Sequence, residues 1–200
     1  MARFADAGGV PTQSAQALAR ESDMVMTCLP TSAEVRDVLF GEGRVAEVLR
    51  PGQIWADMTT GDPGETREMA ARLAEKGVQM IDAPVSGGPH GANAGTIAIM
   101  VGAPAELFAK VKPIFETISP NIFHTGDVGT GHVMKLVNNV ISAGVRAVTF
   151  EALGDGDQER PQPRDLHRRP AEGQCPQRHH RAGIAEIAQG RFHASASLWR

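Results

Sequence analysis

Short apolar segments of strand length alternate along the chain with longer segments whose apolar residues recur at helical spacing. A continuous apolar run such as residues 24–29 is typical of a strand buried in a parallel sheet. Because the links between the segments are short, the pattern predicts right-handed crossovers in a doubly wound α/β domain. The predicted strands are residues 24–29, 54–58, 78–81, 97–101 and 121–125.

Polar residues directly before three of the helical segments predict where those helices begin. Thr12 can cap the first, short helix. Thr31 and Glu34 have the spacing of a capping box. Asp62 precedes Pro63, and proline is favoured at the first position of a helix. We therefore expect helices to start at these three places.

In open α/β sheets, ligands bind beyond the carboxyl ends of the strands. Three turns follow predicted strands, so we expect one crevice to collect them. For each turn taken alone, ordinary turn chemistry is the alternative interpretation. The turns are Leu29-Pro30, Thr59-Thr60 and Ser86-Gly87-Gly88.

A glycine-rich turn leads into the last helix of the regular part of the chain. Gly126, Gly129 and Gly131 allow a tight backbone and the close approach of another group. Lys135 and Asn139 follow at positions i and i+4, on one face of that helix. Such a pair could hold a small polar substrate and exchange a proton with it. The alternative is a lysine that extends into water beside an exposed asparagine.

Two stretches together resemble the β-hydroxyacid dehydrogenase family, which includes 3-hydroxyisobutyrate dehydrogenase and tartronate semialdehyde reductase. The first is D-A-P-V-S-G-G at residues 82–88, and the second is G-x-x-G-x-G-x-x-x-K-x-x-x-N at residues 126–139. The resemblance covers residues 9–153. It implies an NAD- or NADP-dependent oxidoreductase that transfers a hydride between the cofactor and a small 3-hydroxyacid or semialdehyde.

The resemblance also implies a role for each matching residue. Lys135 would be the general acid/base. Because the ordinary pKa of lysine is about 10.4, such a role requires burial or a nearby positive charge. A hydroxyl and adjacent backbone N–H groups, as at Ser86, suit a carboxylate. By resemblance, the substrate-binding residues are Ser86, Gly87, Gly88 and Asn139, and the cofactor-binding residues are Leu29, Pro30 and Thr60.

Three other catalytic interpretations are disfavoured. Ser86 as a hydrolase nucleophile lacks the G-x-S-x-G flanks. His124 and His132 bracket the glycine turn and could be general bases. A lone histidine beside a helix start is more often a surface residue or a hydrogen-bonded polar group.

The chain departs from the family pattern at its N-terminal end. No G-x-G-x-x-G motif precedes residues 24–29, and Gly8-Gly9 has neither the spacing nor a preceding strand. The first strand, first helix and second strand of the family fold are therefore expected to be absent. We expect an incomplete Rossmann-type sheet with an exposed edge and no phosphate loop.

The C-terminal end departs in another way. Helical periodicity ends after Leu153, and residues 154–200 are rich in arginine and histidine and contain no lysine. This change indicates a disordered tail or a shifted reading frame, and the pattern favours the shift. The predicted organisation is a partial NAD(P)-binding domain at 1–131, an inter-domain helix carrying Lys135 at 132–153 toward a missing all-helical domain, and an aberrant tail at 154–200.

Composition excludes several other classes of protein. A net charge of −3 gives no indication of nucleic-acid binding. No apolar run approaches the roughly 20 residues of a membrane span, and the first residues do not resemble a signal peptide. Cys28 and Cys175 are far apart, which indicates free thiols and a cytoplasmic protein. Cys175 with His179 and His180 lacks a fourth ligand, so we expect no metal site.

Two hypotheses remain open from the sequence. One is an NAD(P)-dependent β-hydroxyacid dehydrogenase. The other is a non-catalytic remnant that keeps Lys135 and the substrate turn but lacks the phosphate loop and the helical domain. A homo-oligomer is compatible with the first, because members of the family commonly associate through the helical domain.

Overall fold

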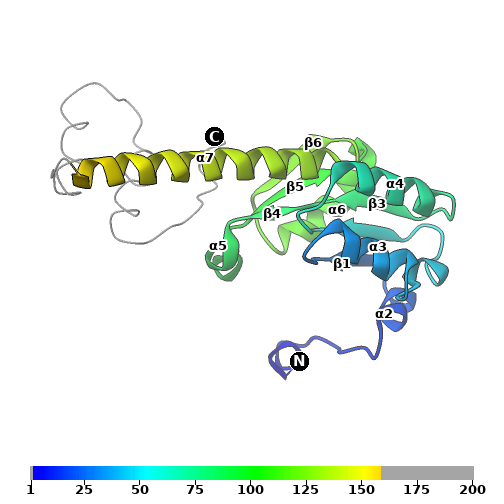
Figure 1. The fold of residues 1–200 in the computed structure, drawn as a ribbon. Coiled ribbons are helices and arrows are strands. Elements are labelled where there is room, and N and C mark those ends of the chain that lie inside the picture. Colours follow the sequence, from blue (N-terminus) through cyan, green and yellow to red (C-terminus); the bar gives the residue numbers. More distant parts are fainter. Residues whose placement is uncertain (1, 159–200) are drawn as a thin grey trace. The chain divides into compact units, whose positions relative to one another are not determined.

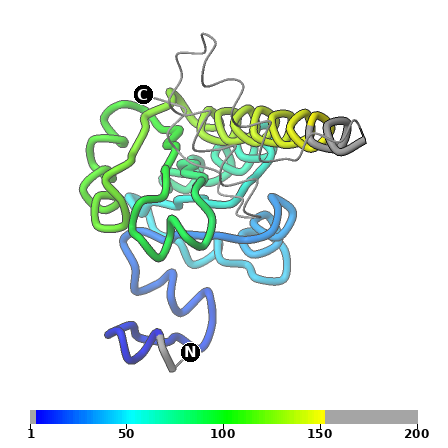
Figure 2. Tube along the Cα trace, turned by 90° about the vertical axis from the view of Figure 1, so that its left-hand side faces the viewer, coloured from blue at the N-terminus to red at the C-terminus, as the bar shows by residue number. Residues whose placement is uncertain are grey.

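The structure is a computed structural model that describes residues 2–158. Helices and strands alternate along this part of the chain, as the apolar pattern predicts (Figure 1). The backbone can be followed from the blue N-terminal end in Figure 2. The elements are α1 (Ala2–Asp6), α2 (Ala15–Glu21), β1 (Met24–Thr27), α3 (Ser32–Phe40), the 3₁₀ helix η1 (Val45–Glu47), β2 (Ile54–Asp57), α4 (Pro63–Ala74), β3 (Gln79–Asp82), β4 (Val85–Ser86), α5 (Gly88–Ala94), β5 (Ala98–Gly102), α6 (Ala105–Glu116), β6 (Ile122–Gly126) and α7 (Thr130–Gln158).

The strands form one six-stranded sheet of order β1-β2-β3-β5-β4, with β6 paired to β5. β1, β2 and β3 are parallel neighbours, and so are β5 and β6. The α/β, Rossmann-like class expected from the sequence is confirmed. One contact differs from the parallel expectation, because β3 and β5 pair antiparallel through Asp82 and Gly102. The last residues of these two strands therefore meet.

Two of the three predicted N-caps are found at the starts of their helices. Thr31 and Glu34 form the expected capping box of α3. Asp62 caps α4 by accepting hydrogen bonds from the N–H groups of Gly64 and Glu65. The prediction for Thr12 is wrong, because the side chain of Ser14 caps α2. Thr12 and Ser14 are both residue types that cap helices, so the sequence offers two candidate caps two residues apart.

The chain divides into two compact units. Among the described residues, one contains residues 2–85 and 98–136, and the other contains residues 86–97 and 137–158. This division places Lys135 in the first unit and Asn139 in the second. α7 runs past Leu153 to Gln158, beyond the point where periodicity ends in the sequence. The rest of the predicted tail lies outside the described residues.

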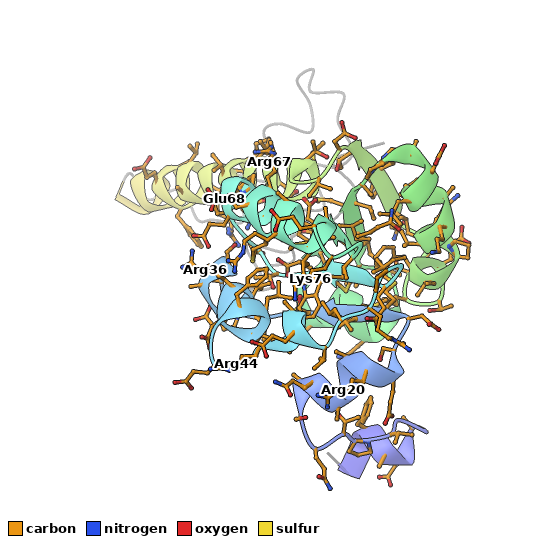
Figure 3. The ribbon with its side chains drawn as sticks, turned by 90° about the vertical axis from the view of Figure 1, so that its right-hand side faces the viewer. Arg20, Arg36, Arg44, Arg67, Glu68 and Lys76 are labelled. Atoms are coloured by element: carbon orange, nitrogen blue, oxygen red, sulfur yellow. The ribbon has the colours of Figure 1, made fainter. Side chains whose placement is uncertain are left out.

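The hydrophobic core of the first unit is formed by β1 to β3 and the helices that follow them. Trp55, Met69 and Leu73 are almost fully buried within it. α6 contributes Leu107, Val111 and Phe115 to the buried set. The charged side chains labelled in Figure 3 belong to helices or to their ends: Arg20 on α2, Arg36 on α3, Arg44 before η1, Arg67 and Glu68 on α4, and Lys76 after it. The strands and the apolar faces of these helices thus provide the buried framework of the first unit.

Candidate active site

Buried polar residues lie side by side at the carboxyl ends of the strands in the first unit. Thr27, Asp57 and Asp82 end β1, β2 and β3, and the strand register places each opposite the next. Asp57 and Asp82 are both fully buried. A buried carboxylate is costly unless it is hydrogen-bonded or paired with a charge. The partners of these two carboxylates therefore define the local structure.

Asp82 anchors the first turn of α7. Its Oδ1 accepts a hydrogen bond from Gly129 N at 2.6 Å, and its Oδ2 accepts one from His132 N at 2.8 Å. N–H groups at a helix start have no partner within the helix, and negative charge is favoured there. Burial raises the pKa of Asp82, whereas these two bonds and the charge of His132 act in the opposite direction. The first residue of the 82–88 motif thus fixes the beginning of the helix that carries Lys135.

The glycines of the 126–139 motif allow the start of α7 to lie close to Asp82 and the sheet. A Cβ at Gly131 would lie under 3.0 Å from the Met100 carbonyl oxygen and from Asp82. A Cβ at Gly102 would lie equally close to Asp82 and to the backbone of Gly131. Gly129 has a φ of +91°, which favours glycine. The sequence predicts that another group approaches these glycines closely. At Gly131 this group is the sheet, through the carbonyl of Met100 in β5 and through Asp82 in β3.

Both histidines beside the glycine turn are hydrogen-bonded within the fold. His132 is fully buried; its Nε2 donates to Thr59 O at 3.0 Å, and its Nδ1 lies 2.9 Å from Thr66 Oγ1. His124 Nε2 donates to the Ala103 carbonyl at 2.7 Å, and its ring stacks on Phe108. Each imidazole is thus a hydrogen-bonded polar group, the alternative that the sequence favoured.

Lys135 is buried, with a relative exposure of 9%. It follows His132 by one helical turn and belongs to the same unit. Burial disfavours the charged amine and lowers the pKa of Lys135. The interpretation of Lys135 as a lysine extended into water does not fit this burial. A lowered pKa is the direction of change that the expected acid/base role of Lys135 requires.

The lowered pKa predicts how Lys135 affects stability. Because its pKa is lower in the folded than in the unfolded chain, its contribution to stability is present above the ordinary value of 10.5 and is lost as pH falls through the folded value. At pH 7 the buried charge therefore costs stability. We expect Lys135→Met to raise the urea midpoint at pH 7, and this gain to shrink at pH 10. Lys112→Met, at an exposed lysine, is the control; equal midpoint changes in the two variants would contradict the assignment.

The second unit contains the residues expected to bind substrate. Gly87 and Gly88 have φ values of +130° and +60°, which other residues rarely adopt. Ser86 Oγ accepts a hydrogen bond from Asn138 Nδ2 at 3.2 Å. Asn139, the residue singled out in the sequence, is exposed. The sequence reasoning missed Asn138, for which the only signal is its place in the Asn138-Asn139 pair.

The residues expected to contact the cofactor follow β1 and β2. Leu29 is half-buried, and its N–H donates to Thr59 Oγ1 at 3.1 Å; Pro30 and Thr60 are exposed. The apolar surface of Leu29 and Pro30 suits a flat ring, and the Thr60 hydroxyl can donate to an oxygen. The chemistry of these three side chains is compatible with the expected contact to a dinucleotide. Residues 2–23 contain no G-x-G-x-x-G for its phosphates.

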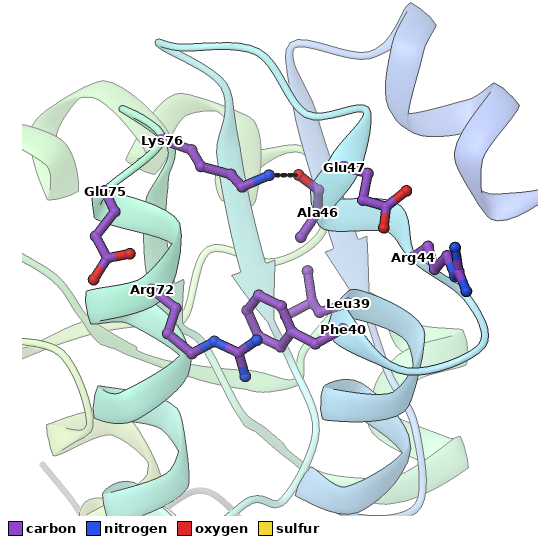
Figure 4. A pocket seen from close by; sticks show the side chains of 8 residues that line it. All are labelled: Leu39, Phe40, Arg44, Ala46, Glu47, Arg72, Glu75 and Lys76. Carbon is purple, nitrogen blue, oxygen red and sulfur yellow. Dashed lines mark hydrogen bonds between the residues drawn. The ribbon is translucent and has the colours of Figure 1, made fainter.

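A surface hollow of about 250 Å³ lies elsewhere in the first unit (Figure 4). Arg72 lies over the Phe40 ring at 3.6 Å, and Lys76 Nζ donates to Ala46 O at 3.0 Å. The residues that line this hollow belong to α3, η1, the end of α4 and adjacent positions. None of the predicted site residues is among them.

Comparison with known families identifies the family of residues 1–126. The family model for the NAD binding domain of 6-phosphogluconate dehydrogenase matches residues 1–126, more than half of the sequence. The chain belongs to this family. The resemblance to the β-hydroxyacid dehydrogenases is confirmed as well, because similar proteins carry those names. The expectation of NAD or NADP as cofactor is confirmed at the level of the family, since the model describes an NAD-binding domain.

Three relatives show the extent of the similarity. 2-(Hydroxymethyl)glutarate dehydrogenase of Eubacterium barkeri is 41% identical over 73% of this chain and 48% of the relative. 2-Hydroxy-3-oxopropionate reductase of Escherichia coli is 38% identical over 73% of this chain and 50% of the relative. The solved 3-hydroxyisobutyrate dehydrogenase of Mycobacterium tuberculosis, with L-serine, is 31% identical with a TM-score of 0.78 and covers 87% of this chain and 60% of that one. The chain thus spans about half the length of the curated relatives it matches.

Residues 2–158 contain neither a membrane-spanning helix nor a cluster of metal ligands. No helix there is long and apolar enough to cross a membrane. No cluster of three or more His, Cys, Asp or Glu side chains in that range could hold a metal ion.

Proposed function

We propose that this chain is an NAD(P)-linked oxidoreductase of the β-hydroxyacid dehydrogenase type, with Lys135 as its general acid/base. The observation that carries the proposal is the burial of Lys135 in an NAD-binding family, on a helix whose first turn is anchored by Asp82. The substrate class is a small 3-hydroxyacid or semialdehyde. Relatives named for such substrates support this class.

Lys135 would move the proton of the reaction. In the oxidation direction, the neutral amine accepts the proton of the substrate hydroxyl, and in the reduction direction the ammonium returns it to the carbonyl oxygen. Burial makes the neutral form more accessible than it is for a lysine in water. NAD(P), when bound, supplies the hydride acceptor or donor.

The remaining roles follow the sequence motifs. Ser86, Gly87 and Gly88 would hold the substrate carboxylate through a hydroxyl and backbone N–H groups, and Asn139 would orient the reacting oxygen. The positive φ values at both glycines support a backbone specialised for such a turn. Leu29, Pro30 and Thr60 would contact the cofactor.

Cofactor binding tests the proposal directly. Titrating the purified chain with NADH and NADPH, followed by cofactor fluorescence, should give saturable binding of at least one. Thr60→Trp places a large ring on the proposed contact surface and should weaken binding at least about tenfold, equivalent to about 1.4 kcal/mol. Thr117→Trp, at an exposed threonine after α6, should change it little. No binding at millimolar cofactor would favour the non-catalytic alternative.

A further inference from the structure

Thr59 joins the two loops assigned to the cofactor. It is buried, with an exposure of 1%, and each of its polar groups has a partner. Its N–H donates to Asp57 Oδ1 at 3.0 Å, and its Oγ1 accepts from Leu29 N at 3.1 Å. Its carbonyl accepts from His132 Nε2 at 3.0 Å. Thr60 therefore follows a residue whose N–H, hydroxyl and carbonyl are each held by a hydrogen bond.

His132 reaches the same turn from α7. Its backbone is bound to Asp82, its Nε2 to Thr59, and its Nδ1 lies within hydrogen-bonding distance of Thr66 on α4. Lys135 is three residues further along α7, on the neighbouring turn of the same face. The one imidazole thus contacts both the helix that carries Lys135 and the turn that carries Thr60.

The surroundings of His132 are shaped for its ring. A Cβ at Gly61 would lie 2.8 Å from His132 Cε1, so the absence of a side chain leaves room for the imidazole. The Oδ2 atoms of Asp57 and Asp82 each lie 4.0 Å from a ring nitrogen. Asp57 Oδ2 has no hydrogen-bond partner among the described residues, which leaves the imidazole as a polar neighbour of that buried oxygen. An apolar residue at position 132 would remove the ring's bonds to Thr59 and Thr66.

We propose that His132 is a positioning residue that couples the Thr59-Thr60 turn to the start of α7, and hence to Lys135. The roles of Thr60 as a cofactor contact and of Lys135 as the acid/base rest on the proposed function. The coupling between the turn and the helix does not depend on those roles. A change that loosens one part must loosen the other, because they share the same hydrogen bonds. His132 itself would touch neither substrate nor cofactor.

Local opening in the chain without cofactor tests this coupling. The readouts are amide hydrogen exchange at residues 59–60 and 131–136 and the rate at which acetic anhydride labels Lys135. Thr66→Val removes the partner of Nδ1, and Thr66→Ser keeps a hydroxyl. We expect Thr66→Val to raise exchange at both segments and the labelling of Lys135 together by about fivefold, the usual effect of one hydrogen bond. Thr66→Ser should stay within about twofold of the unaltered chain.

His132→Leu and His132→Gln form a second pair. Leucine should produce a larger joint increase than Thr66→Val, and glutamine, which keeps a donor, should reverse part of it. Val133→Ala, at an exposed position beside His132, is the control. Unchanged exchange at β5 would show that opening is local.

Independent behaviour of the two segments would overturn the coupling. The decisive observation is faster exchange at residues 131–136 and faster labelling of Lys135 with no change in exchange at residues 59–60, or faster exchange at residues 59–60 alone. If His132→Leu unfolds the whole chain, the Thr66 pair decides alone. Neither readout uses cofactor or turnover, so failure of the coupling and failure of the proposed function are distinguishable.

Discussion

Replacing Lys135 with methionine is expected to lower NAD(P)-linked turnover at least about 100-fold, the lower limit of general acid/base contributions. Methionine fills a similar volume but cannot carry a proton. Because the site is already buried, we expect the fold to be retained and cofactor affinity to change little. The measurement is the initial rate of semialdehyde reduction with NADH and NADPH, together with a titration of each variant with cofactor.

Two further variants separate charge from proton transfer. Lys135→Arg keeps the positive charge, but a guanidinium does not lose its proton in proteins, so turnover should also be lost. Lys112→Met removes an exposed lysine on α6 and should leave the rate unchanged. Turnover that survives in Lys135→Arg would show that the charge, and not the proton, is what the reaction uses.

Gly131→Ala is expected to destabilise the chain by about 3 kcal/mol or more, as overpacking against rigid atoms does. The added methyl group would lie under 3.0 Å from the Met100 carbonyl oxygen and from Asp82. The carbonyl belongs to β5, and Asp82 is held by two hydrogen bonds, so neither can move without breaking the anchor of α7. Urea unfolding followed by circular dichroism measures the change in the free energy of unfolding.

Gly144→Ala is the matched control on the same helix. A Cβ at Gly144 would have no atom within 4 Å. Alanine is favoured over glycine within a helix by roughly 0.5–1 kcal/mol, so this variant should be neutral or slightly more stable. Similar losses in the two variants would mean that any side chain weakens α7, and the contact between its start and the sheet would not be the cause.

The sequence predicts most of the regular structure because local signals determine it. Apolar runs locate β1, β2, β3, β5 and β6 to within about two residues, and capping residues locate α3 and α4. Choices that depend on distant contacts are harder to predict. Ser14 caps α2 although Thr12 is an equally suitable residue type, and the antiparallel meeting of β3 and β5 has no local signal.

The candidate site shows the same division. Helical periodicity predicts one face for Lys135 and Asn139, and burial of Lys135 is compatible with its motif. The role of Asp82 could not be predicted, because its partners Gly129 and His132 are about fifty residues away. The purpose of the glycines at 126, 129 and 131 is ambiguous in the sequence. The same spacing allows the close approach of a bound ligand or of a packed strand. Only coordinates distinguish these two uses.

Transfer of a labelled hydride tests the central claim most directly. The chain would be incubated with NAD⁺ or NADP⁺ and 3-hydroxyisobutyrate deuterated at the hydroxymethyl carbon, and the reduced cofactor analysed by mass spectrometry. The account predicts one deuterium in the reduced cofactor, and none when Lys135 is replaced by methionine. Reduced cofactor without deuterium, or no reduced cofactor from a chain that binds NAD(P), would contradict it.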